Sequence, residues 1–264
     1  MFSASDRVVT YVAATRPLEL ANDLAELIRL LAARNLAREP WHPGDPPADP
    51  ITPDVASLAR YLASVENAWV NALPNPCILT SGELVLVADF PPEGPANVWF
   101  PLPIEPGTDE LLDLLGDVVT TLDGYHAHVE SDPLLMLYQS VRATERARAV
   151  APEEYRHLIP DPFELAGASL VPPLLVPQEY DTRQVPPGVW WANYWDTEQV
   201  RTLGVDRVHA APWARLRPIR SGLLLAATEQ RLDPGRPDHA EVLRALVMEL
   251  GLRAAQERFR TPLA

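Results

Sequence analysis

The spacing of apolar and polar residues predicts several short strands. They are runs of β-branched, aromatic or leucine residues bounded by glycine, proline or polar residues. Ser81 and Gly82 join two of them, a pattern typical of a hairpin. Prolines interrupt residues 98–104, so we expect a sheet edge or a loop there. The predicted strands span residues 7–14, 78–80, 83–88, 125–129, 188–195, 208–216 and 219–228.

Other segments carry apolar residues every three or four positions, which predicts amphipathic helices. Thr108, Asp196 and Asp238 each precede such a segment, where their side chains can accept a hydrogen bond from the first helical turn. Gly251 follows the segment that Asp238 precedes and can end it. The predicted helices span residues 18–38, 54–71, 109–122, 132–149, 197–203 and 239–250.

Strands and helices alternate irregularly, without the regular rhythm of βαβ units. This order predicts an α+β fold with a largely antiparallel sheet flanked by helices. The chain has 29 prolines, which predicts long proline-rich loops, above all over residues 39–50 and 151–187. We expect a single domain over residues 1–264, and any subdivision would fall near residues 150–185.

The charges are unevenly distributed. All 22 basic residues are arginine, which excludes chemistry that needs a lysine amine, such as a P-loop or a Schiff base. Residues 1–141 hold 6 arginines against 20 acidic residues, and residues 142–264 hold 16 of each, so the whole net charge of −14 lies in the first part. Such a surface repels nucleic acid and anionic membranes and favours a basic protein partner, although solubility alone would also explain it.

The chain has one cysteine, Cys77, which excludes an intrachain disulfide and fits a reducing cytoplasm. Its apolar surroundings indicate a buried side chain and not a reactive thiolate. No apolar run approaches the roughly 20 residues of a membrane span, and the first residues lack the pattern of a signal peptide. We therefore expect a cytoplasmic protein.

Two histidines offer the clearest candidate for metal chemistry. His126 and His128 lie on one face of a predicted strand, and with neighbouring carboxylates they would suit a metal-dependent hydrolase. The alternative is a solvent-facing polar strand, which we favour because no third ligand follows at a metal-site spacing. No nucleophile motif or dinucleotide motif is present. We expect no cofactor and no enzymatic activity.

An acidic stripe offers a candidate binding surface. Asp109, Asp113 and Asp117 recur every four residues, opposite the leucines of one predicted helix, and Glu110 lies beside them. Like charges at this spacing repel one another, which binding a cationic partner would explain, although a solvated helix face is the more usual reason.

Aromatic residues could support such binding. Trp41 and Trp99 lie in proline-rich segments and could act as interface anchors, or could pack over an edge of the core. The densest aromatic cluster is more consistent with a buried strand than with ligand stacking. It consists of Trp190, Trp191, Tyr194 and Trp195.

The last third of the chain resembles a known family of proteins. Residues 186–195 (PPGVWWANYW) lead to residues 199–204 (QVRTLG), then to residues 219–228 (IRSGLLLAAT) and residues 232–246 (LDPGRPDHAEVLRAL). This order is similar to the bacterial immunity proteins of polymorphic toxin and type VI secretion systems, in particular the Imm52 family and the related DUF3396 type. The similarity covers roughly residues 185–250.

The resemblance implies an α+β, non-enzymatic inhibitor that binds a toxin domain such as a nuclease, and it specifies no site residues. On the residues alone, the acidic first half agrees with a basic partner. The leading hypothesis is therefore an immunity protein that occludes its toxin through Asp109, Glu110, Asp113 and Asp117, with Trp41 and Trp99 as anchors. A hydrolase using His126 and His128, or a structural subunit of a secretion system, are the alternatives.

Overall fold

The structure is a computed structural model of the 264-residue chain. The chain forms two compact units, residues 1–128 and 129–264. The structure describes residues 7–12, 17–44, 49–66, 77–82, 84–89, 96–102, 107–130, 144, 147–148, 151–153, 156, 179–232 and 237–260.

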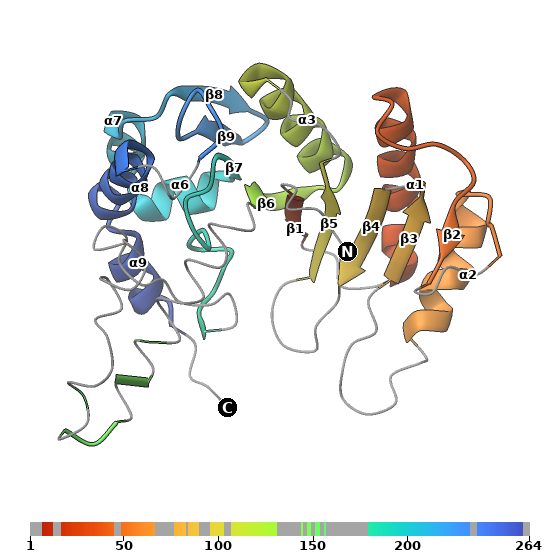
Figure 1. Ribbon diagram of the computed structural model, residues 1–264, viewed down its shortest axis with the longest axis horizontal. Helices are drawn as coiled ribbons and strands as arrows, with labels where there is room; N and C mark the ends of the chain where they lie inside the picture. The colour runs from red at the N-terminus through yellow and green to blue at the C-terminus, as the bar shows by residue number, and fades with distance from the viewer. Residues whose placement is uncertain are drawn as a thin grey trace. The chain divides into compact units, whose positions relative to one another are not determined.

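The first unit pairs its strands mainly in antiparallel fashion (Figure 1). The strand order is β2-β3-β4-β5-β1-β6. Helix α1 packs against both α2 and α3, while α2 contacts β3 and α3 contacts β1. The elements are β1 (Arg7–Val12), α1 (Pro17–Ala33), β2 (His42–Pro43), α2 (Val55–Glu66), β3 (Cys77–Ser81), β4 (Leu84–Asp89), β5 (Ala96–Pro101), α3 (Thr108–Thr121) and β6 (Gly124–Glu130).

The second unit has the strand order β7-β9-β8, and both pairings are antiparallel. Helix α6 packs against β7 and β9, and α9 packs against α6 and α8. The elements are β7 (Ala192–Trp195), α6 (Thr197–Leu203), α7 (Val205–Ala210), β8 (Arg215–Ile219), β9 (Gly222–Ala226), α8 (Pro237–Glu249) and α9 (Leu252–Arg258). The predicted α+β class, with antiparallel strands flanked by helices, is confirmed.

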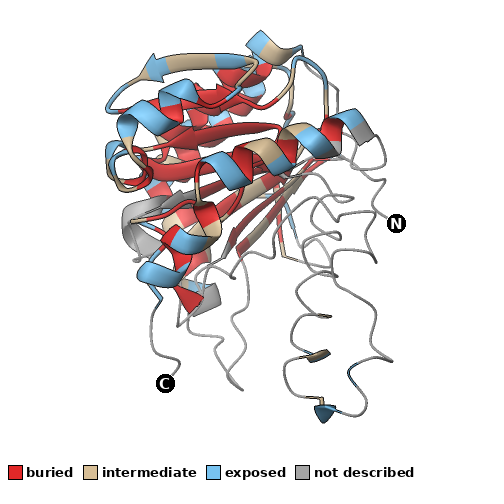
Figure 2. Cartoon of the chain, turned by 90° about the vertical axis from the view of Figure 1, so that its left-hand side faces the viewer, coloured by how far each residue is buried: buried red, intermediate tan, exposed pale blue. Residues whose placement is uncertain are grey.

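Buried residues lie on the strands and on the sheet-facing sides of the helices (Figure 2). In the first unit, Leu24, Leu27 and Leu31 of α1 are fully buried. Tyr61 joins α2 to β3, because its hydroxyl donates to the Ile78 carbonyl (2.9 Å) and accepts from the Ile78 N–H (3.2 Å). In the second unit, β9 is buried along its whole length.

Side-chain amides hold residues 179–191, a segment that forms no strand of its own. The Asn193 amide accepts from the Trp190 N–H (3.0 Å) and donates to the Trp190 carbonyl (2.9 Å). Gln199 donates to the Thr182 carbonyl (2.7 Å), and Gln256 donates to the Pro186 carbonyl (3.1 Å). These buried amides satisfy backbone groups that a sheet would otherwise satisfy.

Several predicted elements are wrong in type or extent. Residues 98–104 were expected at an edge, but β5 lies inside the sheet and pairs with both β4 and β1. The predicted strand over 208–216 is instead the end of α7, a loop and the start of β8. Of residues 188–195, only β7 is a strand, and α9 was not predicted. The predicted helix over 132–149 falls mostly outside the described residues.

The helix starts are partly as predicted. Asp196 caps α6, since its carboxylate accepts from the Gln199 N–H (2.9 Å). Gly107, and not Thr108, is the N-cap of α3. Helix α8 begins at Pro237, so Asp238 lies in its first turn and is not its cap. Gly251 follows α8 in the left-handed region (φ 60°), as a helix end requires.

Gly222 should be indispensable at the start of β9. A Cβ there would lie 2.3 Å from the Trp195 carbonyl oxygen and 2.8 Å from the Tyr194 ring. We expect G222A to lower the free energy of unfolding by about 2–4 kcal/mol, because backbone must move to admit the methyl group. In the control variant G107A the new Cβ meets nothing within 4 Å, and only the weaker cap preference is lost, about 1 kcal/mol at most. Urea denaturation measures both; equal losses would contradict the steric argument.

Asp196 gives a pH-dependent prediction. Burial raises the pKa of its carboxyl above the ordinary 3.8, despite the opposing hydrogen bonds from the α6 backbone. A carboxyl with a raised folded-state pKa stabilises the fold most when protonated, so this contribution is lost as the pH rises through that pKa. The stability of the wild type relative to D196N should therefore fall from pH 3 upward. D196A should lose about 1 kcal/mol at neutral pH through the missing cap, which D196N keeps.

Candidate partner-binding surface

Helix α3 separates an apolar face from an acidic face. Leu111, Leu115 and Val118 are at most 1% exposed, whereas Asp109, Asp113 and Asp117 are all exposed. The predicted division of this helix into a core face and a carboxylate face is therefore what the structure shows. Because the leucines are fixed in the core, the helix cannot rotate to hide its carboxylates.

The acidic residues of α3 differ in what they contact. The Glu110 carboxylate accepts from the Gly107 N–H (3.3 Å), so it takes part in the start of the helix. Asp117 forms an ion pair with Arg34. Arg34 directly follows α1, the helix that packs against α3. Asp109 and Asp113 lie one turn apart at the N-terminal half of the same face. Both side chains are exposed to solvent.

Neighbouring carboxylates also meet where α1 and α3 pack. Burial, and secondarily the charge of Asp123, raise the pKa of the Asp23 carboxyl. Asp123 is exposed and follows the end of α3 with a left-handed backbone (φ 47°). The charge of Asp123 therefore adds to burial in disfavouring the ionised form of Asp23.

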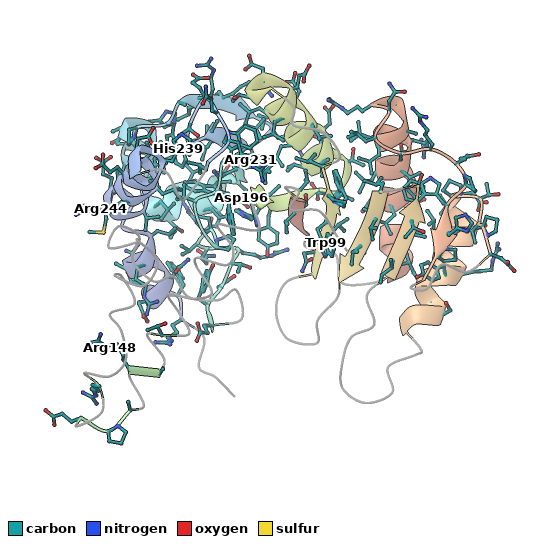
Figure 3. All side chains as sticks on the ribbon, viewed as in Figure 1. Trp99, Arg148, Asp196, Arg231, His239 and Arg244 are labelled. Carbon is teal, nitrogen blue, oxygen red and sulfur yellow. The ribbon has the colours of Figure 1, made fainter. Side chains whose placement is uncertain are left out.

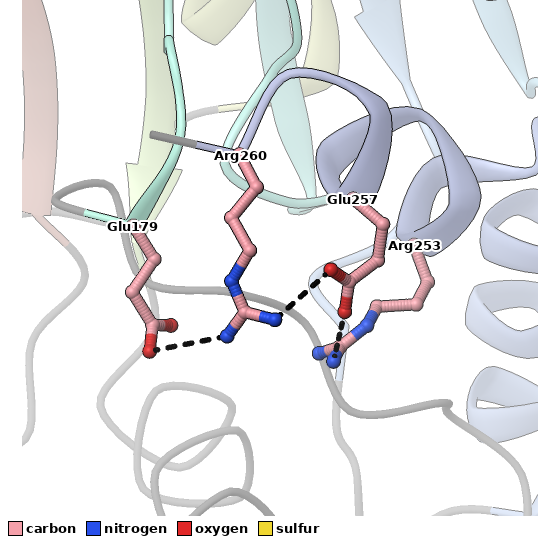
Figure 4. A network of polar contacts seen from close by, with 4 residues as sticks. All are labelled: Glu179, Arg253, Glu257 and Arg260. Atoms are coloured by element: carbon pink, nitrogen blue, oxygen red, sulfur yellow. Dashed lines mark hydrogen bonds and ion pairs between the residues drawn. The ribbon is translucent and has the colours of Figure 1, made fainter. Parts of the chain in front are cut away.

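In the second unit, arginines and carboxylates form a local network (Figure 4). The Glu257 carboxylate forms ion pairs with the guanidinium groups of Arg253 (2.6 Å) and Arg260 (3.1 Å). Arg260 also lies 4.0 Å from the carboxylate of the buried Glu179. Arg215 pairs with Glu229, and Arg201 pairs with Glu198. These pairs agree with the balanced composition of residues 142–264 and contrast with the acidic face of α3.

The two predicted aromatic anchors are placed differently. Trp41 is 1% exposed and bridges to Ile51, so it packs in the core and does not present a binding surface in this structure. Trp99, labelled on β5 in Figure 3, is half-buried and packs against Val9 and Tyr125. Trp41 therefore packs in the core and is not an interface anchor in this structure. Trp99 is partly exposed and could still contact a partner.

The predicted histidine pair is buried. His126 and His128 on β6 are 0% and 1% exposed, so the expectation of a solvent-facing strand is wrong. The His126 Nε2 and His128 Nδ1 atoms are 3.0 Å apart, within hydrogen-bond distance. Over the described ranges, no group of three histidine, cysteine or carboxylate residues is arranged to hold a metal ion. This part of the chain therefore supplies two of the ligands a hydrolase would need, without a third.

The other aromatic cluster belongs to the core, as predicted. Trp190, Trp191, Tyr194 and Trp195 are all at most 5% exposed. Trp195 meets Trp213 edge to face, with ring centroids 5.3 Å apart. The burial of these side chains favours a core role over ligand stacking.

Comparison with known proteins gives a match among solved structures. No family model and no curated protein matches the sequence. Among solved structures, the chain is similar to the Pseudomonas aeruginosa T6SS (type VI secretion system) protein PA0821, with a TM-score of 0.55 and 13% identity. The match covers 94% of this chain and 73% of that chain, so nearly the whole chain shares its fold with a T6SS protein. None of the described helices combines the length and apolar character that a membrane crossing requires.

Cys77 should be chemically silent in the folded protein. It is 2% exposed, and burial raises the pKa of its thiol to about 12. Because the thiolate is the reactive form, we expect no labelling by a thiol reagent at pH 8 in the native state and full labelling in denaturant. Mass spectrometry of the labelled protein measures this. Rapid native labelling would show that the structure around Cys77, at the start of β3, opens.

Proposed function

We propose that this protein is a non-enzymatic immunity protein of a type VI secretion setting that binds and neutralises a cognate toxin. The observation that carries the proposal is the acidic face of α3, which is held outward by a fully buried opposite face. The fold shared with a T6SS protein supports the setting. The sequence resemblance to the Imm52 and DUF3396 immunity proteins supports the role.

The proposed mechanism is occlusion. Asp109 and Asp113 would pair with arginine or lysine side chains around the toxin's active site, and the partly exposed Trp99 could add apolar contact at a separate point. A nuclease is the favoured class of toxin, because nucleases present basic surfaces to phosphate. Carboxylates at the rim of such an interface act mainly on the association rate. At Asp117 a toxin cation would compete with Arg34, which already pairs with that carboxylate.

The alternative of a secretion-system structural subunit predicts a different assembly. Purification from the native host, with partner identity and stoichiometry read by mass spectrometry, separates the two. A one-to-one complex with a basic toxin domain supports immunity. Self-assembly, or a complex with secretion-apparatus components in many copies, would favour the structural role.

The double variant D109N/D113N tests the assigned surface. It removes two charges from the exposed face of α3 without touching the buried leucines. At low salt we expect the association rate with the toxin to fall by about an order of magnitude, and its dependence on salt to flatten. Stopped-flow or surface-based kinetics measures both quantities.

The matched control is E241Q/E249Q, which removes two exposed charges from α8 in the second unit. This control should leave the association rate close to that of the wild type. If both variants slow association equally, net charge and not the α3 face steers the partner. If neither does, the toxin binds elsewhere.

A further inference from the structure

Strand β8 lies at one end of the strand order in the second unit. In the part of the chain that the structure describes, its strand neighbour is β9. A strand at the end of a sheet presents backbone N–H and C=O groups that can pair with a strand from another molecule. Whether β8 can do so depends on which of its groups point away from β9.

The register with β9 settles the direction of each N–H. Ile219 pairs with Gly222 across a two-residue turn, so these two residues form a hydrogen-bonded pair. Because the direction alternates along a strand, the N–H groups of residues 215, 217 and 219 point toward β9. The backbone positions of residues 216 and 218 point away from it.

Residue 218 is a proline, which has no N–H to donate. Because position 218 points away from β9, the missing N–H takes no hydrogen bond from the pairing with β9. It does remove a donor from the outer edge of β8. Pro218 is exposed, which agrees with an uncovered edge at this point.

We propose that Pro218 blocks the outer edge of β8 against the addition of a further strand, first of all the β8 of a second copy of this chain. Two such edges would meet in antiparallel fashion around a twofold axis. This inference goes beyond the proposed function and is independent of it. It also means that a partner does not bind this protein by extending the sheet at β8.

The test restores the missing donor. P218T adds an N–H and a residue that favours strands, and P212T makes the same substitution at an exposed proline in the loop before β8. Circular dichroism and thermal melting first establish that each variant is folded. Light scattering after gel filtration then measures mass over a wide range of protein concentrations. Hydrogen exchange measures protection of the amides at positions 216 and 218.

We expect P218T to shift toward twice the wild-type mass or beyond as its concentration rises, with slower exchange at position 216. P212T should keep the wild-type mass. A folded P218T that keeps the wild-type mass and exchange overturns the proposal, and so does equal association of P212T. If P218T does not fold, P218A restores the same N–H with less side-chain change and is judged by the same criteria.

Discussion

The burial of the leucine face of α3 is the constraint from which the functional proposal follows. Leu111 and Leu115 are fully enclosed, and α3 contacts both α1 and β1. An amphipathic helix held in this way has one rotational setting, so the identity of its outward residues is a consequence of core packing. The carboxylates are therefore displayed because the leucines are buried. Repulsion along the stripe is a small cost, about a few tenths of a kcal/mol for each pair, beside the burial of those side chains.

In the second unit, residues 179–191 form no strand, so other groups must satisfy their backbone hydrogen bonds. Three buried amide side chains, Asn193, Gln199 and Gln256, bond to backbone groups of residues 182–190. Each amide replaces contacts that water would make, and an unsatisfied group would cost about 1–3 kcal/mol. The position of this segment thus depends on a few polar side chains, from Asn193, three positions from its partner, to Gln256, 70 positions from its partner.

Sequence periodicity predicted the elements that are stabilised locally. The amphipathic helices α1, α2 and α3, the β3–β4 hairpin and the Asp196 cap depend on neighbours within a few residues, and they appear as expected. The placement of β5 between β4 and β1 depends on partners far along the chain, and its flanking prolines suggested an edge. The proline at its end, Pro101, pairs at the last position of the strand, where a missing N–H disturbs the ladder least.

In the candidate site, too, local features could be predicted from the sequence and contacts between distant residues could not. That Asp109 and Asp113 share an exposed face follows from helical spacing alone, whereas the Arg34–Asp117 pair joins residues 83 positions apart and could not be read from the sequence. The burial of Trp41 and of the histidine pair was also invisible, because polar and apolar residues within a loop or a short strand do not reveal which face is covered.

The two units therefore offer a partner different kinds of surface. In the first unit, a rigid helix presents fixed carboxylates, and recognition there would operate through side chains. In the second, the strand order ends in β8, where one of the two outward backbone positions, residue 218, is a proline. A protein that must bind one partner tightly gains from this combination, because specific side-chain pairing discriminates among surfaces, whereas backbone pairing accepts almost any extended strand.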